Sequence, residues 1–247
     1  MSIRTDIWID RMCKANPLYV DLAGHQVVEY LQPPYSLREN HFIDDLHRRE
    51  AAIAEGATVT IASHGRHVER ATNFEPMITP YVDMPTREVD GQPVLSFGLS
   101  SMGYDVRLAK GLKVFTDIYS PIIDPKGLDT KAFIDVDDDV VIIPPNGFAL
   151  GHTVETFNIP RDVAVICMGK STYARAGVAI NITPIEPGFK GQVVIEIANC
   201  TNSPVKIYTG EGIAQFMFFQ SDRNCRVSYA DKNGKYQGQS GIQLPLV

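Results

Sequence analysis

Residues 76–247 consist of short runs of β-branched and aromatic residues, separated by clusters of Gly, Pro, Asn and Asp. Runs of this length and composition are typical of β-strands. No helical pattern separates them, which argues against a parallel α/β sheet. We therefore expect a mainly β domain, folded as a sandwich, a jelly roll or a distorted barrel. The runs are GLKVFTDIY, DDDVVIIPPNGFALGHTVETFNIP, DVAVICMG, GVAINITP, GQVVIEIAN, SPVKIYTG and EGIAQFMFFQ, with turn signals at Pro144–Gly147 and Pro187–Gly188.

The N-terminal third has a different pattern. Ile7–Met12 reads as one short helix, and Ser36 followed by Glu39 matches a capping box at the start of a second helix that ends near Gly56. This second helix belongs to an added α-rich element, with one short strand expected around Ala57–Ala62. The sequence thus divides into three predicted parts, residues 1–16, 17–75 and 76–247.

The composition limits the kinds of partner that the chain can bind. The 247 residues are 44% hydrophobic and 21% charged, as in ordinary globular domains. A net charge of −6 gives no global positive field to attract DNA or RNA. No apolar run approaches the roughly 20 residues that span a bilayer, and the charged N-terminus MSIRTDIWIDRM does not match a signal peptide. We expect a cytoplasmic protein that binds neither nucleic acid nor membranes.

Zinc chemistry finds little support in the sequence. His67-Val68-Glu69 matches half of the zinc deaminase signature, but the P-C-x-x-C half is absent. The cysteines form no C-x-x-C pair, so we expect buried thiols rather than disulfides or zinc ligands. These cysteines are Cys13, Cys167, Cys200 and Cys225. The histidines of the added element have Arg and Glu neighbours, and we interpret them as solvated; they are His41, His47, His64 and His67.

The segment GKSTYARAG, residues 169–177, resembles the end of a phosphate-binding loop. A Walker A loop has a glycine five residues before its Gly-Lys pair. Here that position is Ala164, and the run VAVICM before the segment predicts a strand, so the P-loop interpretation fails. Taken alone, the segment is better explained by solvated charges at Lys170 and Arg175 beside a turn.

The run GQVVIEIAN, residues 191–199, carries one charged residue, Glu196, in an otherwise apolar stretch. In an extended strand, Val193, Ile195 and Ile197 point to one face and Glu196 to the other. A carboxylate kept from water on that second face would suit a general acid or base. The strand alone favours the alternative, an ordinary glutamate on the wet face of an antiparallel sheet.

Several separated stretches together change this balance. They resemble, in order and spacing, the dCTP deaminase branch of the dUTPase-like family, over residues 1–16 and about 76–247. The resemblance implies a dUTPase-like distorted jelly roll or β-clip barrel with a few short helices, and residues 17–75 depart from it. The stretches are SFGLSSMGYDVRLAKGLKVFT, IIPPNGFALGHTVETFNIPRD, GKSTYARAGVAINITPIEPGFKGQVVIEIAN, KIYTGEGIAQFMFF and SYADKNGKYQGQSGIQLP.

The resemblance also assigns roles to individual residues. Glu196 falls on the family's catalytic glutamate, and Ser171 and Arg175 fall on residues that shape the reaction site. Lys170, Thr172, Tyr173 and Ala174 complete the nucleotide-binding segment, while Val194 and Ile195 line the pyrimidine side through the strand backbone. The positions expected to contact the triphosphate are Gln215, Tyr229, Lys235 and Gln239.

The implied activity is hydrolysis of dCTP to dUTP and ammonia, with Mg²⁺ bound by the triphosphate and no zinc at the base. The implied assembly is a homotrimer with active sites between subunits, a flexible tail (about residues 229–247) that closes over the phosphates, and dTTP as a feedback inhibitor. A bifunctional enzyme that continues to dUMP and pyrophosphate is the closest alternative, and the loop TPIEPG with Glu186 would decide it. A plain dUTPase and a catalytically silent nucleotide sensor are further alternatives. Residues 17–75 would cap the trimer, recruit a partner or shift substrate choice.

Overall fold

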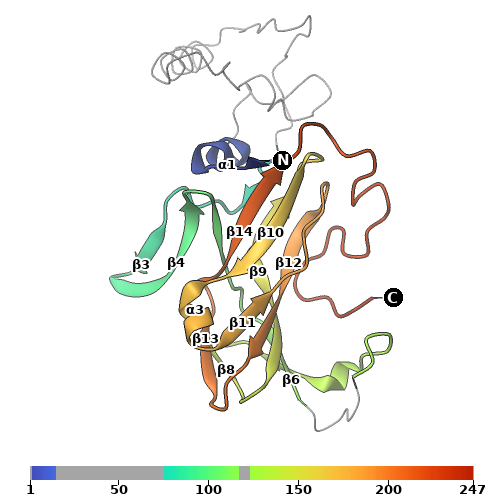
Figure 1. Ribbon diagram of the computed structural model, residues 1–247. Coiled ribbons are helices and arrows are strands. Elements are labelled where there is room, and N and C mark those ends of the chain that lie inside the picture. Colours follow the sequence, from blue (N-terminus) through green and yellow to red (C-terminus); the bar gives the residue numbers. More distant parts are fainter. Residues whose placement is uncertain (1, 15–74, 117–122, 247) are drawn as a thin grey trace, which may run out of the picture. The chain divides into compact units, whose positions relative to one another are not determined.

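The protein is described by a computed structural model that covers residues 2–14, 75–116 and 123–246 (Figure 1). Residues Met1–Cys13 and Pro76–Val247 belong to one unit, and Lys14–Glu75 form a second. The predictions for the helix at Ser36–Gly56, for the four histidines and for the role of residues 17–75 lie outside the described residues. The division of the chain into three parts therefore stays a prediction.

Two six-stranded sheets make up most of the described fold, and every strand pairing in them is antiparallel. The first contains, in order, β1 (Ser2–Ile3), β14 (Gly212–Gln220), β5 (Gly103–Arg107), β4 (Gln92–Ser100) and β3 (Thr86–Val89), with β10 (Val163–Gly169) also paired to β14. The second contains β11 (Val178–Asn181), β12 (Lys190–Asn199), β9 (Phe148–Asn158), β6 (Leu112–Phe115) and β7 (Phe133–Val136), with β2 (Ile78–Thr79) paired to β9. A separate ribbon pairs β8 (Val140–Ile143) with β13 (Val205–Tyr208).

Helices are few and short in this part of the chain. They are α1 (Asp6–Cys13), α3 (Ser171–Arg175) and the 3-10 turn η3 (Thr130–Ala132). None of the described helices has the length and hydropathy needed to span a membrane. The prediction of a mainly β fold with a few short helices is confirmed, and each apolar run listed above contains a strand where the chain is described.

The two sheets bury aromatic side chains between them. The rings of Phe157 on β9 and Phe216 on β14 lie 5.0 Å apart, and both side chains are fully buried. Every second residue of β14 faces this core, so Phe218 is buried as well. Burial of a phenylalanine side chain contributes about 1.5–3 kcal/mol. The alternating pattern thus holds the sheets together and fixes which face of each strand remains for a site.

The N-terminal helix is anchored to the β domain. Asp6 accepts a hydrogen bond from the Ile7 amide at 2.8 Å, and Ile9 and Met12, three residues apart, are both buried. The Met12 carbonyl accepts a hydrogen bond from the Met77 amide at 2.9 Å. The chain therefore leaves the first unit after α1 and returns to it at an adjacent point.

The cysteines are free thiols, but their burial differs from the prediction. Cys13 is buried as expected, Cys167 and Cys225 are half-buried, and Cys200 is exposed. Cys200 follows Asn199, which occupies the inward position at the end of β12 and donates to the carbonyls of residues 143, 144 and 203. Because side chains alternate along a strand, the next residue points outward. The prediction of a buried thiol is therefore wrong for Cys200.

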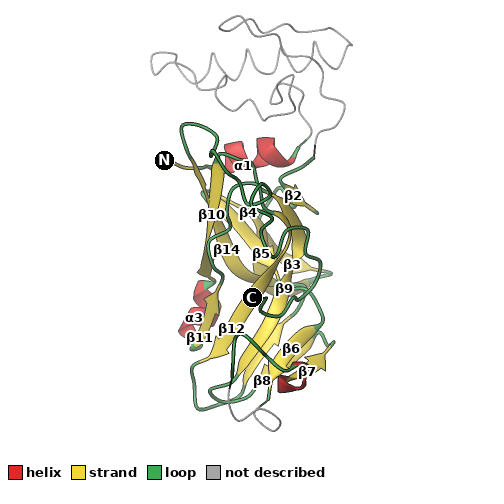
Figure 2. Ribbon diagram, turned by 90° about the vertical axis from the view of Figure 1, so that its right-hand side faces the viewer, coloured by secondary structure: helices red, strands yellow, loops and turns green. Residues whose placement is uncertain are grey.

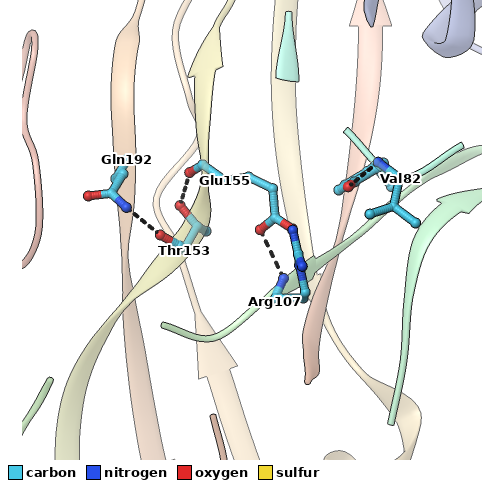
Figure 3. A network of polar contacts seen from close by, with 6 residues as sticks. Val82, Arg107, Thr153, Glu155 and Gln192 are labelled. Carbon is cyan, nitrogen blue, oxygen red and sulfur yellow. Dashed lines mark hydrogen bonds and ion pairs between the residues drawn. The ribbon is translucent and has the colours of Figure 1, made fainter. Parts of the chain in front are cut away.

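A buried ion pair joins the two sheets (Figure 3). Glu155 on β9 is fully buried, and its carboxylate accepts hydrogen bonds from Arg107 on β5, from Nε at 2.8 Å and from the backbone amide at 3.0 Å. Burial raises the pKa of Glu155, and the bonds from Arg107 act against that rise. Thr153 continues the network: its hydroxyl donates to the Glu155 carbonyl at 2.6 Å and accepts from the Val193 amide at 3.0 Å.

Candidate active site

A pocket of about 350 Å³ lies beside β12, within the size range of small-molecule sites. Three parts of the chain enclose it: strands β9 and β12, the loop between β11 and β12, and the C-terminal tail, which we define as residues 229–246. The lining residues are Leu150, Ile182, Thr183, Pro184, Ile185, Glu186, Phe189, Val193, Val194, Glu196, Tyr229, Tyr236, Gln239, Gln243 and Pro245.

Glu196 reaches the pocket from β12. The predicted alternation is observed: Ile195 and Ile197 are fully buried, whereas Val194 and Glu196 on the opposite face are only half-buried. The Glu196 carboxylate accepts a hydrogen bond from the Asn181 side-chain amide, and the two residues are direct partners in the β11–β12 pairing. Leu150 lies opposite on β9. Glu196 therefore combines an apolar wall with one fixed amide donor, an arrangement that suits proton transfer better than a fully solvated surface position does.

The tail is docked along β12 (Figure 2). Its start is fixed by Arg161, whose guanidinium forms two bonds to the Asp231 carboxylate, at 2.6 and 3.1 Å. This contact lowers the pKa of Asp231 below its usual range. The Tyr229 ring packs edge-on against Phe189 at 5.8 Å, and Lys232 pairs with Glu186. The predicted closing tail thus forms one wall of the pocket in this structure.

The segment Lys170–Arg175 does not line the pocket. Residues 171, 172, 174 and 175 are exposed on α3, which lies at the outer end of β11, away from the tail (Figures 1 and 2). Tyr173 is buried, and its hydroxyl accepts a hydrogen bond from the Tyr208 amide at 3.0 Å. Burial raises the pKa of Tyr173 to about 12. The third residue of this short helix faces inward, so its side chain anchors α3 to β13.

Lys170 belongs to a second polar cluster. Its Nζ lies 2.6 Å from Asp105 Oδ2, and the two side chains are only 12% and 16% exposed. Gln215 is the direct partner of Asp105 in the β5–β14 pairing and donates to Ser100 Oγ at 3.0 Å. The interpretation of Lys170 as a solvated charge is therefore wrong, since burial beside Asp105 requires the ion pair.

The remaining predicted residues lie in the pocket, in the core and on the surface. Val194, Glu196, Tyr229 and Gln239 line the pocket. The Ile195 side chain is fully buried in the core, which is compatible only with a role for its backbone. Lys235 is exposed and donates to the Leu246 carbonyl at 3.1 Å, outside the pocket lining.

Two ionisable side chains near Glu196 are poorly suited to catalysis. The pKa of Cys167 is raised to about 12, first by burial and second by the Glu196 charge, so the thiol stays protonated at neutral pH. His152 is the partner of Val194 on β9, and burial lowers the pKa of its imidazole. Both groups are therefore neutral at pH 7, and Glu196 faces no thiolate or imidazolium from these positions.

The sequence prediction missed Asn181, Phe189, Tyr236 and Gln243. For Asn181 a signal exists, because antiparallel pairing of GVAIN with VVIEIAN across a short loop brings it opposite Glu196. Tyr236 and Gln243 lie in an irregular segment whose docking no periodicity predicts.

Comparison with known proteins identifies the family. A family model described as dCTP deaminase-like matches residues 78–221. The chain belongs to the dCTP deaminase-like family. A dCTP deaminase of Ectopseudomonas mendocina (strain ymp) is 55% identical over 178 residues, which cover 72% of this chain and 95% of that protein. A dCTP deaminase of Acinetobacter baumannii (strain AYE) is 51% identical over 181 residues, 73% of this chain and 96% of that protein.

Among solved structures, the 2'-deoxycytidine 5'-triphosphate deaminase from Agrobacterium tumefaciens matches with 17% identity and a TM-score of 0.42, over 57% of this chain and 42% of that one. The family resemblance inferred from the sequence is confirmed by the family model and the curated relatives. These relatives are matched over nearly their whole length, whereas more than a quarter of this chain lies outside the match.

Proposed function

We propose that the protein hydrolyses dCTP to dUTP and ammonia. The observation that carries this proposal is Glu196, which projects from β12 into a pocket and is held there by Asn181. The high identity to dCTP deaminases over nearly their whole length supports the choice of substrate. A binder without catalysis would not need a carboxylate oriented in this way.

In the proposed reaction, Glu196 accepts a proton from water as the oxygen attacks C4 of cytosine, and passes this proton to N3. The proton of the new C4 hydroxyl then passes to the amino group, the C4–N4 bond breaks, ammonia leaves, and the C4 carbonyl of uracil forms. Asn181 occupies Oε2 of Glu196, so the second carboxylate oxygen remains for the water. Leu150, Val194 and Phe189 supply apolar wall for the ring, and Tyr229 and Gln239 of the tail would face the triphosphate.

Substitution of Glu196 by Gln tests the proton-transfer role. The variant keeps the size of the side chain and removes its basicity, so turnover should disappear while dCTP still binds, as measured by calorimetry. If Glu196→Gln retained more than about one tenth of wild-type turnover, Glu196 would not be the base.

The active site would be completed by a neighbouring subunit. Ser171 and Arg175 do not line the pocket of their own chain, yet their side chains are exposed. Just before them on β10, the apolar side chains of Ile166 and Met168 are 43% and 56% exposed to solvent. Exposed apolar side chains beside exposed polar site candidates fit an interface between copies. The proposed assembly is the homotrimer, in which α3 of one subunit faces the pocket of the next.

Mixing two inactive variants tests this arrangement directly. Arg175→Ala and Glu196→Gln subunits are unfolded together, refolded at equal amounts and assayed with dCTP. If each site takes Glu196 from one subunit and Arg175 from the next, about one quarter of the sites recover both wild-type residues. If both residues belonged to one chain, mixing would restore nothing.

Magnesium enters this proposal as part of the substrate. The described residues contain no cluster of three or more His, Cys, Asp or Glu side chains that could hold a metal ion. Among the described residues that line the pocket, Glu186 and Glu196 carry the carboxylates. Two carboxylates do not supply a complete set of Mg²⁺ ligands. The ion would instead be held mainly by triphosphate oxygens, because Mg²⁺ prefers phosphate and water ligands.

The bifunctional alternative has one observation in its favour. Residues 183–186 of the loop TPIEPG (183–188), which is expected to decide between one and two reactions, line the pocket, and Glu186 is one of them. Glu186 is paired with Lys232, however, so a second reaction at this carboxylate would have to compete with the ion pair. We therefore favour the deaminase alone. Inhibition by dTTP remains a prediction from the family resemblance.

A further inference from the structure

The tail meets β12 at one residue that none of the assignments above includes. The backbone amide of Gln192 donates to the Gln239 carbonyl at 3.0 Å, and the Gln192 carbonyl accepts from the Gln239 side-chain amide at 2.6 Å. The Gln192 side-chain oxygen accepts from the Gly241 amide at 2.7 Å and from Ser240 Oγ at 3.4 Å. One residue thus binds three consecutive residues of the tail.

The side chain of Gln192 is itself fixed from the core side. Its Nε2 donates to the Thr153 carbonyl at 2.9 Å, as Figure 3 shows. The β9–β12 register shifts between Gln192 and Val194. At this point the Thr153 hydroxyl accepts a hydrogen bond from the Val193 amide. A bulge of this kind redirects side chains. Thr153 is in turn bound to Glu155, so the orientation of Gln192 depends on the buried network between the sheets.

The strand beside Gln192 is shaped to receive the tail. Gly191 has a φ of 144°, and a Cβ at this position would lie 2.8 Å from the Gln239 carbonyl oxygen and 3.0 Å from its amide nitrogen. Only glycine permits such a close approach of two backbones. The amide of Gly238 also donates to the Lys190 carbonyl at 2.7 Å, so residues 190–192 bind the tail almost as an added strand would be bound.

We propose that Gln192 is a positioning residue that holds the tail closed over the pocket and fixes Gln239 and its neighbours against the substrate. Gln192 itself does not line the pocket, so its effect would pass through the tail. Gln239, Tyr229 and Tyr236 line the pocket from the tail side, and release of residues 239–241 would open that wall. This inference rests on the proposed deaminase function for its kinetic readout, but not for its structural one.

Two variants of the full chain separate the roles of the side chain. Gln192→Met keeps its length and loses both donor and acceptor, while leaving the backbone bonds to Gln239. Gln192→Glu keeps an acceptor for Gly241 and loses the donor to Thr153. Thr156→Val is the matched control, because Thr156 is exposed and pairs with Gln192 on β9 but makes none of the tail bonds described here.

Amide hydrogen exchange is the first readout. The Gly241 amide, which donates to Gln192, should exchange about five- to tenfold faster in Gln192→Met, the effect of losing one net hydrogen bond. Gln192→Glu should lie between Gln192→Met and the wild type. The Gly238 amide, which is bound to Lys190, should change less than that of Gly241, and Thr156→Val should match the wild type at both.

Steady-state kinetics with dCTP and Mg²⁺ give the second readout. Gln192→Met should raise KM about five- to tenfold with kcat within about twofold of the wild type, since a loosened tail weakens binding and leaves Glu196 in place. A merely structural residue would instead lower the midpoint of unfolding and accelerate exchange throughout β9 and β12, and that result overturns the proposal. Unchanged Gly241 exchange in Gln192→Met also overturns it.

The two levels of inference fail separately. If wild-type protein does not turn over dCTP, the proposed function is wrong, and the exchange of Gly241 still decides the role of Gln192. If the wild type is active but Gln192→Met has normal KM and normal exchange, only the positioning role is wrong.

Discussion

Glu155→Gln should destabilise the fold more than any change to a surface ion pair. The Glu155 side chain is fully buried, and its partner Arg107 is only 18% exposed, with its guanidinium 4.9 Å from the centre of the Phe97 ring. Glutamine keeps the volume and one acceptor but leaves the arginine charge without its counter-charge. Breaking a buried pair in this way costs about 3–5 kcal/mol of unfolding free energy, and we expect the lower end, about 3 kcal/mol, because Arg107 keeps some solvent contact.

For a domain of this size, each kcal/mol lowers the melting temperature by roughly 2–4 °C, so Glu155→Gln should melt about 6–12 °C below the wild type. Scanning calorimetry at pH 7 and one fixed protein concentration measures this, since oligomers melt in a concentration-dependent way. The double change Arg107→Met with Glu155→Leu should be less destabilised than Glu155→Gln alone, because a buried pair replaced by apolar side chains leaves no unpaired charge. Arg107 Nη2 already lacks a hydrogen-bond partner, which makes this replacement less costly.

The matched control is the pair of Lys113 and Asp135, whose atoms also lie close together, at 2.5 Å, but whose side chains are 28% and 78% exposed. Asp135→Asn should cost less than about 1 kcal/mol, the usual value for a surface pair. If Glu155→Gln were no more destabilising than Asp135→Asn, burial would not be what makes the Arg107–Glu155 pair important, and the reasoning would be wrong.

Three further predictions concern the site and its supports. Asn181→Ala should lower kcat for dCTP about tenfold with little change in melting temperature, because the exposed Asn181 orients Glu196 rather than packing in the core; an unchanged kcat would remove Asn181 from the mechanism. Arg161→Ala should raise KM at most about fivefold by freeing Asp231 at the start of the tail, as expected for an exposed pair, and a loss of kcat instead would contradict this. Burial raises the pKa of Tyr173 to about 12, so the stability it contributes is complete below the pKa of an unfolded tyrosine, about 10, and is lost as pH rises from there through 12. In urea unfolding, Tyr173→Phe should therefore lose less stability than the wild type between pH 10 and 12, and equal losses would show that Tyr173 does not titrate in this range.

The strands could be predicted because their residues carry a period of two. In β12 the sequence alone identifies which side chains face the core and which lie on the same face as Glu196, since the alternate positions 193, 195 and 197 are Val or Ile. The helix α1 is marked by Ile9 and Met12 on one face. These features depend on local pattern, which a single sequence contains.

The pocket could not be predicted in the same way. Its outer wall comes from the tail, where Tyr236 and Gln243 follow no periodicity. Tyr236 is held by bonds within the tail itself: its amide donates to the Tyr229 hydroxyl, and its hydroxyl accepts from the Leu246 amide. For Lys170, the segment taken alone favoured a solvated charge beside a turn, whereas the β10–β14 and β5–β14 pairings bring Asp105 to it. The burial of Tyr173 was not predicted either, because only the inward turn of a five-residue helix shows that this side chain packs against the domain. Such contacts are set by tertiary packing rather than by neighbouring residues in the sequence.

The central claim is that this chain converts dCTP to dUTP with Glu196 as the proton carrier. The most direct measurement is to incubate wild-type protein and Glu196→Gln with dCTP and Mg²⁺, separate the nucleotides by anion exchange, and measure ammonia. We predict that wild-type protein accumulates dUTP with one ammonia per dCTP consumed, and that Glu196→Gln forms neither. Formation of dUMP and pyrophosphate without lasting dUTP would contradict the single reaction, and dCTP left unchanged by the wild type would contradict the proposed function itself.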